Sequence, residues 1–233
     1  MAEASSSSPY AFYAFYQLYR HFHKIPAVSL QTIDERLYQG KGVKPEFAKC
    51  PLFVTWKKLS RHGQYQLRGC IGTFAECEIE QGLTRYALIA ALQDSRFSPI
   101  SEKELALLSC GTNLLSNFKT IYKKNNAAAA SPDSLPKSSI FDWELGKHGI
   151  ELKFRHPKTG ARLSATFLPE VMPEQGWNQQ ETFENLVEKA GCWKYVTLVM
   201  DHWDEYFEEV IRYEGTKSQI TWEEFESKLP MIT

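Results

Sequence analysis

The stretch LFVTWKKLSRHGQYQLRGCIGTF, residues 52–74, predicts a β-hairpin. Two runs rich in β-branched and aromatic residues, 52–59 and 65–74, flank a short polar segment that contains a glycine. The second run is unusual for a strand, because its LRGCIG segment (67–72) contains two glycines, an arginine and a cysteine. Glycine weakens a strand, and a buried guanidinium is costly unless it is paired. The hairpin therefore indicates the class of fold and marks the first place to look for a site.

Single helices are predicted on both sides of this hairpin. Ser8 followed by Pro9 is typical of a helix start, and the helix predicted over 10–24 carries aromatic residues at helical spacing. We expect this aromatic stripe to face the core. A second helix is predicted over 79–93, and residues 25–50 are predicted to form a surface loop.

The rest of the chain predicts short strands and further single helices. A short helix is expected near 102–108, and strands are expected over 141–145, 150–154 and 163–168. Asn178 with Glu181, and Thr221 with Glu224, are capping-box patterns that predict two more helix starts. Hairpins that alternate with single helices predict an α+β fold with an antiparallel sheet.

Composition excludes several classes of protein. The 233 residues carry a net charge of −1, so the basic surplus of a dedicated nucleic-acid-binding protein is absent. No apolar run is long enough to span a membrane, and the first residues lack the features of a signal peptide. Five cysteines without a C-x-x-C pair indicate reduced thiols and argue against a zinc ribbon. We expect a protein of the cytoplasm or nucleus, without a metal site or cofactor.

Arg68 and Cys70 are the first candidates for chemistry. Side chains alternate across a strand, so both are expected on one face, where the charge of Arg68 would favour the thiolate of Cys70. Gly69 and Gly72 would leave the backbone bare for the close approach of a ligand or of another chain segment. A structural alternative stays open, because glycines form bulges, arginines pair with carboxylates and cysteines are often buried.

Five titratable residues complete the candidate set. Asp94 follows the second predicted helix, where a carboxylate opposes the helix dipole, and Arg96 is its expected partner. His148 lies in a turn between two glycines, is expected near the surface and could act as a general base. Glu170 and Lys189 are further candidates for ligand binding. The alternative for each of the five is a solvated side chain or a structural ion pair.

Taken together, these motifs resemble those of the AMMECR domain family, named for a human chromosomal region linked to Alport syndrome, midface hypoplasia and elliptocytosis. The matching segments follow the family's order and extend from about residue 10 to 225. They are PLFVTWKK (51–58), LRGCIGTF (67–74), ALQDSRFSPI (91–100), LLSNF (114–118), DWELGKHGIELKF (142–154), ATFLPEV (165–171), EQGW (174–177) and KAGCWK (189–194). The chain departs from the family at 111–118, which reads GTNLLSNF where V-S-L-L-T-N-F is common.

The resemblance implies an α+β fold of two unequal lobes, with a barrel-like antiparallel sheet and flanking helices. It implies a single AMMECR-type domain over 9–233, interrupted by a low-complexity loop at about 122–139 and preceded by a disordered tail at 1–8. The LRGCIG segment would face a cleft between the lobes. Some family members are fused to, or encoded beside, Memo-type and radical S-adenosylmethionine proteins, so a functional link to such proteins is implied. No reaction is assigned to the family.

Two functions follow from these residues and from the resemblance. The first is a small-molecule-binding or catalytic cleft, with Cys70 as nucleophile or redox thiol, Arg68 as anion holder and His148 as base. The residues expected to bind the substrate are Gly69, Gly72, Asp94, Arg96, Glu170 and Lys189. The second is a non-catalytic adaptor that binds a protein partner through the same cleft. A purely architectural role of the LRGCIG segment is a third interpretation, and neither a nucleic acid nor a membrane is expected as a partner.

Overall fold

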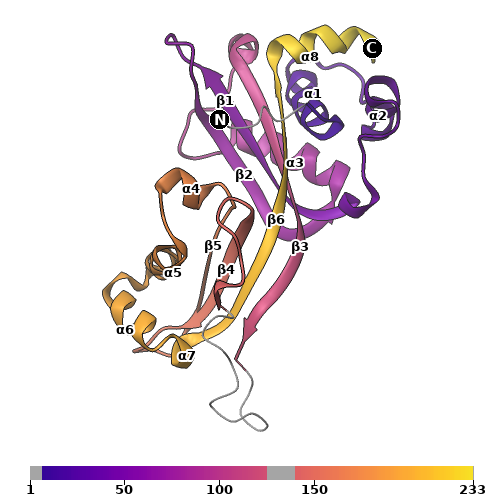
Figure 1. The fold of residues 1–233 in the computed structure, drawn as a ribbon. Coiled ribbons are helices and arrows are strands. Elements are labelled where there is room, and N and C mark those ends of the chain that lie inside the picture. The colour runs from indigo at the N-terminus through magenta and orange to yellow at the C-terminus, as the bar shows by residue number, and fades with distance from the viewer. Residues whose placement is uncertain (1–6, 125–139, 233) are drawn as a thin grey trace. The chain divides into compact units, whose positions relative to one another are not determined.

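The computed structural model describes residues 7–124 and 140–232, which form two compact units (Figure 1). Unit 1 comprises the chain up to Ser116 and from Thr216 onward, and unit 2 comprises Asn117–Gly215. The expectations for a tail and for a low-complexity loop fall largely on residues 1–6 and 125–139, which lie outside the described residues.

The described strands form one six-stranded sheet in the order β2-β1-β3-β6-β4-β5. The strands are β1 (Lys49–Leu59), β2 (Tyr65–Glu78), β3 (Leu108–Lys123), β4 (His148–Arg155), β5 (Arg162–Phe167) and β6 (Phe207–Thr221). β1 pairs antiparallel with β2 and β3, and β4 pairs antiparallel with β5 and β6. β3 and β6 each contribute residues to both units. The predicted α+β class with an antiparallel sheet is confirmed.

Unit 1 is built around the hairpin β1–β2 and the helix that follows it. Its helices are α1 (Pro9–His23), α2 (Leu30–Tyr38), α3 (Ile79–Leu92) and α8 (Trp222–Lys228), with 3₁₀ helices η1 (Pro45–Phe47), η2 (Glu102–Leu107) and η6 (Leu229–Met231). α3 packs on both strands of the hairpin. The aromatic stripe of α1 is buried as predicted, and the Phe15 ring stacks on Phe225 at 4.5 Å between centroids and meets Trp56 edge-on. The Ser8 hydroxyl caps α1, as its sequence predicts.

Unit 2 has its own core around Phe183. This ring packs against Phe207 at 5.5 Å between centroids, and both side chains are fully buried. The helices are α4 (Val171–Gln175), α5 (Gln179–Val187), α6 (Val196–Asp201) and α7 (Trp203–Tyr206), with a π-helical turn η4 (Glu188–Cys192) and a 3₁₀ turn η5 (Trp193–Tyr195). The capping box of Asn178 and Glu181 at the start of α5 is confirmed.

Two local predictions are wrong. Residues 25–50 are not only a loop, because α2 forms there with Ser29 as its N-cap and buries Leu30 and Ile33. Its apolar pattern covers too few residues to stand out in the sequence. The strand expected over 141–145 is absent from the described structure; local turns occupy this segment instead, and the strand β4 begins only at His148.

Candidate functional site

Arg68 occupies a β-bulge in the hairpin of unit 1. Trp56 on β1 pairs with Gly69 on β2, whereas the next residue, Lys57, pairs with Leu67. Arg68 is therefore the extra residue of the bulge. A bulge interrupts the alternation of side chains, so residues beyond it cannot be assigned to a face by counting in twos.

The Arg68 side chain binds Glu104, on the side of the sheet that faces α3. Its Nε and Nη2 donate to the Glu104 carboxylate at 3.0 and 3.2 Å, and Lys58 donates to the same carboxylate at 2.8 Å. Lys58 lies two residues from Trp56, whose indole N–H bonds to the main chain of α3. Burial raises the pKa of Glu104, but the hydrogen bonds from Arg68 and Lys58 outweigh it and lower that pKa to about 2. The prediction that Arg68 and Cys70 share one face is wrong, because the bulge shifts Arg68 to the other side.

Gly69 and Gly72 lie where other backbone segments approach β2 closely. A Cβ atom at Gly69 would lie 2.1 Å from the carbonyl oxygen of Ala90 in α3. A Cβ atom at Gly72 would lie 2.2 Å from the carbonyl oxygen of Leu52 and 2.5 Å from the Phe53 ring. Both glycines are thus required by packing, which is the second of the two reasons expected for them. A role in binding a ligand stays a prediction.

Asp94 and Arg96 bind the main chain of Cys70 on the edge strand β2. The Asp94 carboxylate is 5% exposed and accepts the Cys70 N–H at 2.9 Å. Arg96 donates to both oxygens of Asp94, at 2.9 and 2.7 Å, and its Nη2 donates to the Cys70 carbonyl at 3.1 Å. The predicted pairing of Asp94 with Arg96 is confirmed, and both residues also bind the strand that carries the LRGCIG segment. Hydrogen bonding from Arg96 lowers the pKa of Asp94 well below its usual range despite burial. The pair also covers the polar backbone of an edge strand at this point.

The Cys70 side chain lies in a row of cross-strand neighbours. Thr55 on β1 pairs with Cys70 on one side and with Gly111 of β3 on the other. The Thr55 hydroxyl lies 3.1 Å from the Cys70 sulfur. Ser109 and Asn113 flank Gly111 at two-residue spacing, which places them on the same face of β3. We call the following five residues the Cys70 face: Thr55, Cys70, Ser109, Gly111 and Asn113.

Two buried polar side chains of the Cys70 face make no hydrogen bond within the described residues. Asn113 is 6% exposed, and neither its Oδ1 nor its Nδ2 has a partner there; the hydroxyl of Ser109 is also buried without one. Buried polar groups are nearly always hydrogen-bonded, so such a pair calls for an explanation. A Cβ atom at Gly111 would meet only ordinary contacts, at 3.7 Å and beyond, so the row is not tightly filled at that position. The sequence analysis missed Ser109 and Asn113, since it did not place the strand pairing of β3.

An arginine acts on the charge of two cysteines, Arg96 on Cys70 and Arg85 on Cys77, but at Cys77 burial outweighs it. Burial raises the pKa of Cys50 to about 11, raises those of Cys77 and Cys192, and raises that of Cys110 well above its usual value. Cys70 is half-buried; the hydrogen bond to Asp94 is the main cause of the raised pKa of Arg96, and the charge of Cys70 adds to it. Such an interaction favours the thiolate form of the sulfur. The cation beside the thiol is therefore Arg96, where the sequence analysis expected Arg68.

His148 lies in unit 2 and is buried, at 4% exposed, so the expectation of a surface position is wrong. The main-chain N–H of Glu144 donates to its Nδ1 at 2.9 Å, and its Nε2 lies 3.6 Å from the Glu214 carboxylate. The ring thereby holds the turn that precedes β4. Burial and the nearby charge of Arg212 lower the pKa of His148, which keeps the imidazole neutral. Its Nδ1 lone pair is already used by the main chain, and the role as a base stays a prediction.

Lys189 and Glu170 also lie in unit 2, near the end of β5. The Lys189 ammonium donates to the carbonyl of Thr166 at 2.8 Å and lies 4.4 Å from the centre of the Phe167 ring. Burial raises the pKa of Tyr213, and the charge of the half-buried Glu170 adds to the rise; the Tyr213 hydroxyl donates to the carbonyl of Phe167 on β5. In unit 1 the structure thus brings the Asp94–Arg96 pair to Cys70, whereas Arg68 lies on the other side of the sheet. Glu170 and Lys189 gather separately in unit 2, and a shared cleft of Cys70 and His148 stays a prediction.

The family model for AMMECR1 matches residues 11–218, nearly the whole chain. The chain belongs to the AMMECR1 family. An uncharacterized protein of Kluyveromyces lactis is 65% identical over 227 residues, covering 97% of this chain and 96% of the relative. An uncharacterized protein of Saccharomyces cerevisiae is 52% identical over 247 residues, covering all of this chain and 93% of the relative. The resemblance to the AMMECR domain family is thereby confirmed.

A solved structure supports the fold of this AMMECR1-family chain. The crystal structure of an uncharacterized protein from Pyrococcus horikoshii matches with a TM-score of 0.55 and 20% sequence identity, covering 92% of this chain and 93% of that one. At this identity the match shows the fold alone. Among the helices of the described residues, none is long and apolar enough to cross a membrane. Within the same residues, no group of three or more His, Cys, Asp or Glu side chains is placed to hold a metal ion.

Proposed function

We propose that the Cys70 face of this AMMECR1-family chain binds a small polar molecule and that Cys70 is its reactive thiol. The observation that carries the proposal is the buried amide of Asn113, which has no hydrogen-bond partner among the described residues. An asparagine amide offers an acceptor and two donors, so it matches an amide or an acid group of a ligand. Leaving it without a partner would cost about 1–3 kcal/mol, which a bound polar group offsets.

The neighbouring residues fit a nucleophilic or redox role of the thiol. Arg96 supplies the positive charge that favours the thiolate, and the Asp94 carboxylate fixes Arg96 in place through two hydrogen bonds. The amide N–H of Asn113 and the hydroxyl of Ser109 are donors of the kind that stabilise a developing oxyanion. The other cysteines have pKa values raised by burial, which disfavours their thiolates.

A metabolite-retention experiment tests this function. Wild type, Cys70→Ala, Asn113→Leu and a control variant at an exposed position, Ser95→Ala, are each incubated with pools of small metabolites, washed on a filter and analysed by mass spectrometry. We expect at least one compound that wild type and Ser95→Ala retain and that Cys70→Ala and Asn113→Leu lose. No retained compound, or one retained equally by all four proteins, contradicts the proposal. Leucine has the same branched outline as asparagine, although it is somewhat larger, and circular dichroism checks that the fold of Asn113→Leu is intact.

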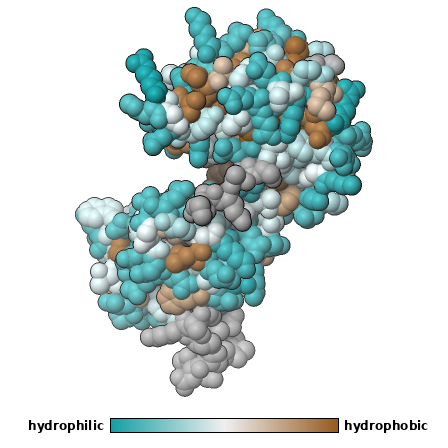
Figure 2. All heavy atoms as spheres, turned by 45° about the horizontal axis from the view of Figure 1, so that its top comes forward, coloured by the Kyte–Doolittle hydropathy of each residue, from teal (hydrophilic) through white to brown (hydrophobic). Residues whose placement is uncertain are grey.

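An adaptor function is the second candidate, and exposed apolar residues on the edge strand β2 favour it. Leu67 is 44% exposed and Phe74 is 39% exposed, on either side of Cys70 along this strand. On the surface in view in Figure 2, hydrophobic residues form small, separate groups. Edge strands with apolar side chains recruit extended peptides. The double variant Leu67→Ser, Phe74→Ser should lose a protein partner that binds this edge, and Asn113→Leu should keep it. A ligand of the Cys70 face should instead be lost by Asn113→Leu and kept by the double variant.

A further inference from the structure

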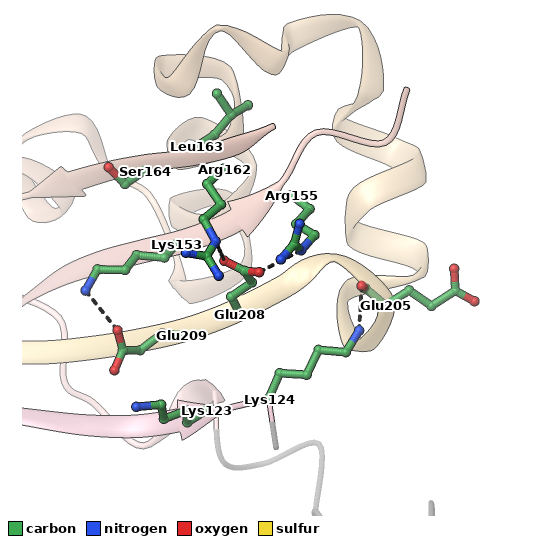
Figure 3. A pocket seen from close by; sticks show the side chains of 10 residues that line it. All are labelled: Lys123, Lys124, Lys153, Arg155, Arg162, Leu163, Ser164, Glu205, Glu208 and Glu209. Carbon is green, nitrogen blue, oxygen red and sulfur yellow. Dashed lines mark hydrogen bonds and ion pairs between the residues drawn. The ribbon is translucent and has the colours of Figure 1, made fainter. Parts of the chain in front are cut away.

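A concave site lies entirely on unit 2. It is a pocket of about 660 Å³, lined by residues of β3, β4, β5 and β6 and by Lys124 and Glu205 (Figure 3). A volume of this size is in the range of small-molecule sites. None of the residues considered above for chemistry lines it.

The pocket has more positive than negative side chains. Five cationic and three anionic side chains line it, an excess of two positive charges. The Glu205 carboxylate points away from the other side chains, and Lys124 binds the main-chain carbonyl of Glu205 at 2.7 Å instead (Figure 3). Only Glu208 and Glu209 therefore direct their carboxylates towards the cations. The side chain of Lys123 is exposed, and its charge acts on the carboxylate of Glu209, whose pKa is lowered chiefly by the hydrogen bond from Lys153.

Two arginines face each other across the strands in this pocket. Arg155 of β4 and Arg162 of β5 are direct cross-strand partners, an arrangement in which like charges destabilise a sheet. A single carboxylate, that of Glu208, serves both, at 2.7 Å from the Nε of Arg155 and 3.3 Å from that of Arg162. Lys153 is paired with Glu209 at 2.8 Å. The two arginines thus share one carboxylate, and Lys123 and Lys153 share the charge of Glu209.

We infer that this pocket binds the phosphate group of a small phosphorylated compound. A phosphate monoester carries about −1.5 to −2 charges near neutral pH, which matches the excess of two positive charges. The planar guanidinium of an arginine donates to phosphate oxygens in a forked geometry, and Arg162 is exposed enough to do so. Bound phosphate would also relieve the repulsion between Arg155 and Arg162. The pocket uses no residue of the Cys70 face, so this inference is independent of the proposed function.

Isothermal titration calorimetry with inorganic pyrophosphate tests the inference. The full chain is titrated at constant ionic strength, with Arg162→Gln and Lys123→Gln as pocket variants. Lys158→Gln, in the turn between β4 and β5 and outside the pocket, is the matched control. We expect saturable binding by wild type and Lys158→Gln, and at least a tenfold weaker affinity for each pocket variant. Cys70→Ala should bind as wild type does.

Three results would overturn the inference. The first is the absence of saturable binding by wild type at millimolar pyrophosphate. The second is an equal loss of affinity in Lys158→Gln, which would indicate a general effect of surface charge. The third is a competition series in which sulfate or citrate displaces pyrophosphate as well as inorganic phosphate does, since the pocket would then bind any small anion. The pocket variants change exposed or half-buried side chains, so each should keep the wild-type circular dichroism spectrum.

Discussion

Replacing Gly69 with alanine should distort the packing of α3 on the hairpin. The new Cβ atom would lie 2.1 Å from the carbonyl oxygen of Ala90 and 3.1 Å from its carbonyl carbon. Non-bonded carbon atoms prefer separations of about 3.5–4.0 Å, so helix and strand must separate by roughly 1 Å. The carbonyl oxygen and carbon of Ala90 belong to the backbone of α3, so neither can move aside by a side-chain rotation. Gly111→Ala is the matched control, because a Cβ atom there meets only ordinary contacts, at 3.7 Å and beyond.

The size of the effect follows from what α3 holds in place. Overpacking in a core costs about 1–3 kcal/mol. The separation also stretches the hydrogen bond from the Trp56 indole to the Ala87 carbonyl, which is 2.9 Å long, and this adds about 1 kcal/mol. We expect Gly69→Ala to lower the free energy of unfolding of unit 1 by about 2–4 kcal/mol. Gly111→Ala should change it by about 0.5 kcal/mol or less.

Urea denaturation measures this difference. With a slope of roughly 2 kcal/mol per molar urea, the midpoint of Gly69→Ala should fall by about 1–2 M. Hydrogen exchange of peptides from α3 and β2, followed by mass spectrometry, assigns the transition to unit 1. A Gly69→Ala variant as stable as Gly111→Ala would refute the packing argument and would return Gly69 to the list of ligand-binding residues.

Three further predictions concern charged groups. Asp94→Asn should lower the stability of unit 1 by about 2 kcal/mol at pH 7, the lower part of the usual range because Arg96 is partly exposed. Folding lowers the pKa of Asp94, so its contribution to the free energy of unfolding is present above the ordinary carboxyl pKa and is lost on acidification. The difference in stability between wild type and Asp94→Asn should therefore shrink as the pH falls below about 4. A difference that stays constant with pH would contradict this. A double-mutant cycle of Arg68→Gln and Glu104→Gln should give a coupling of about 1 kcal/mol or more, and additive effects would show that the pair is not formed. In an NMR pH titration, His148 should protonate below the ordinary histidine pKa of 6.5, and protonation above that value would be inconsistent with its burial.

Much of the fold could be predicted because its signals are local. The hairpin, the Ser8 cap, the buried stripe of α1 and the Asn178–Glu181 capping box depend on neighbouring residues, and each is found in the structure. The contact between Asp94 and Arg96 could also be predicted from the sequence, since a carboxylate at the end of a helix needs a compensating partner.

The details of the site could not be predicted, because they depend on strand register. One extra residue at Arg68 transfers its charge to the α3 side of the sheet, and nothing within LRGCIG distinguishes that bulge from a regular strand. Ser109 and Asn113 join Thr55 only through the pairing of β3 with β1, which links positions more than fifty residues apart. The burial of His148 likewise depends on a contact with the main chain of Glu144 that the turn sequence does not reveal.

The central claim is that Cys70 is a reactive thiol favoured by Arg96, and a timed alkylation experiment tests it most directly. The native chain is treated with limiting iodoacetamide at neutral pH, and peptide mass spectrometry measures the rate at each of the five cysteines. We predict that Cys70 is labelled first, that Arg96→Gln slows its labelling, and that Arg68→Gln, which changes a residue on the other side of the sheet, leaves the rate unchanged. Labelling that begins at any other cysteine while Cys70 stays unmodified would contradict the account.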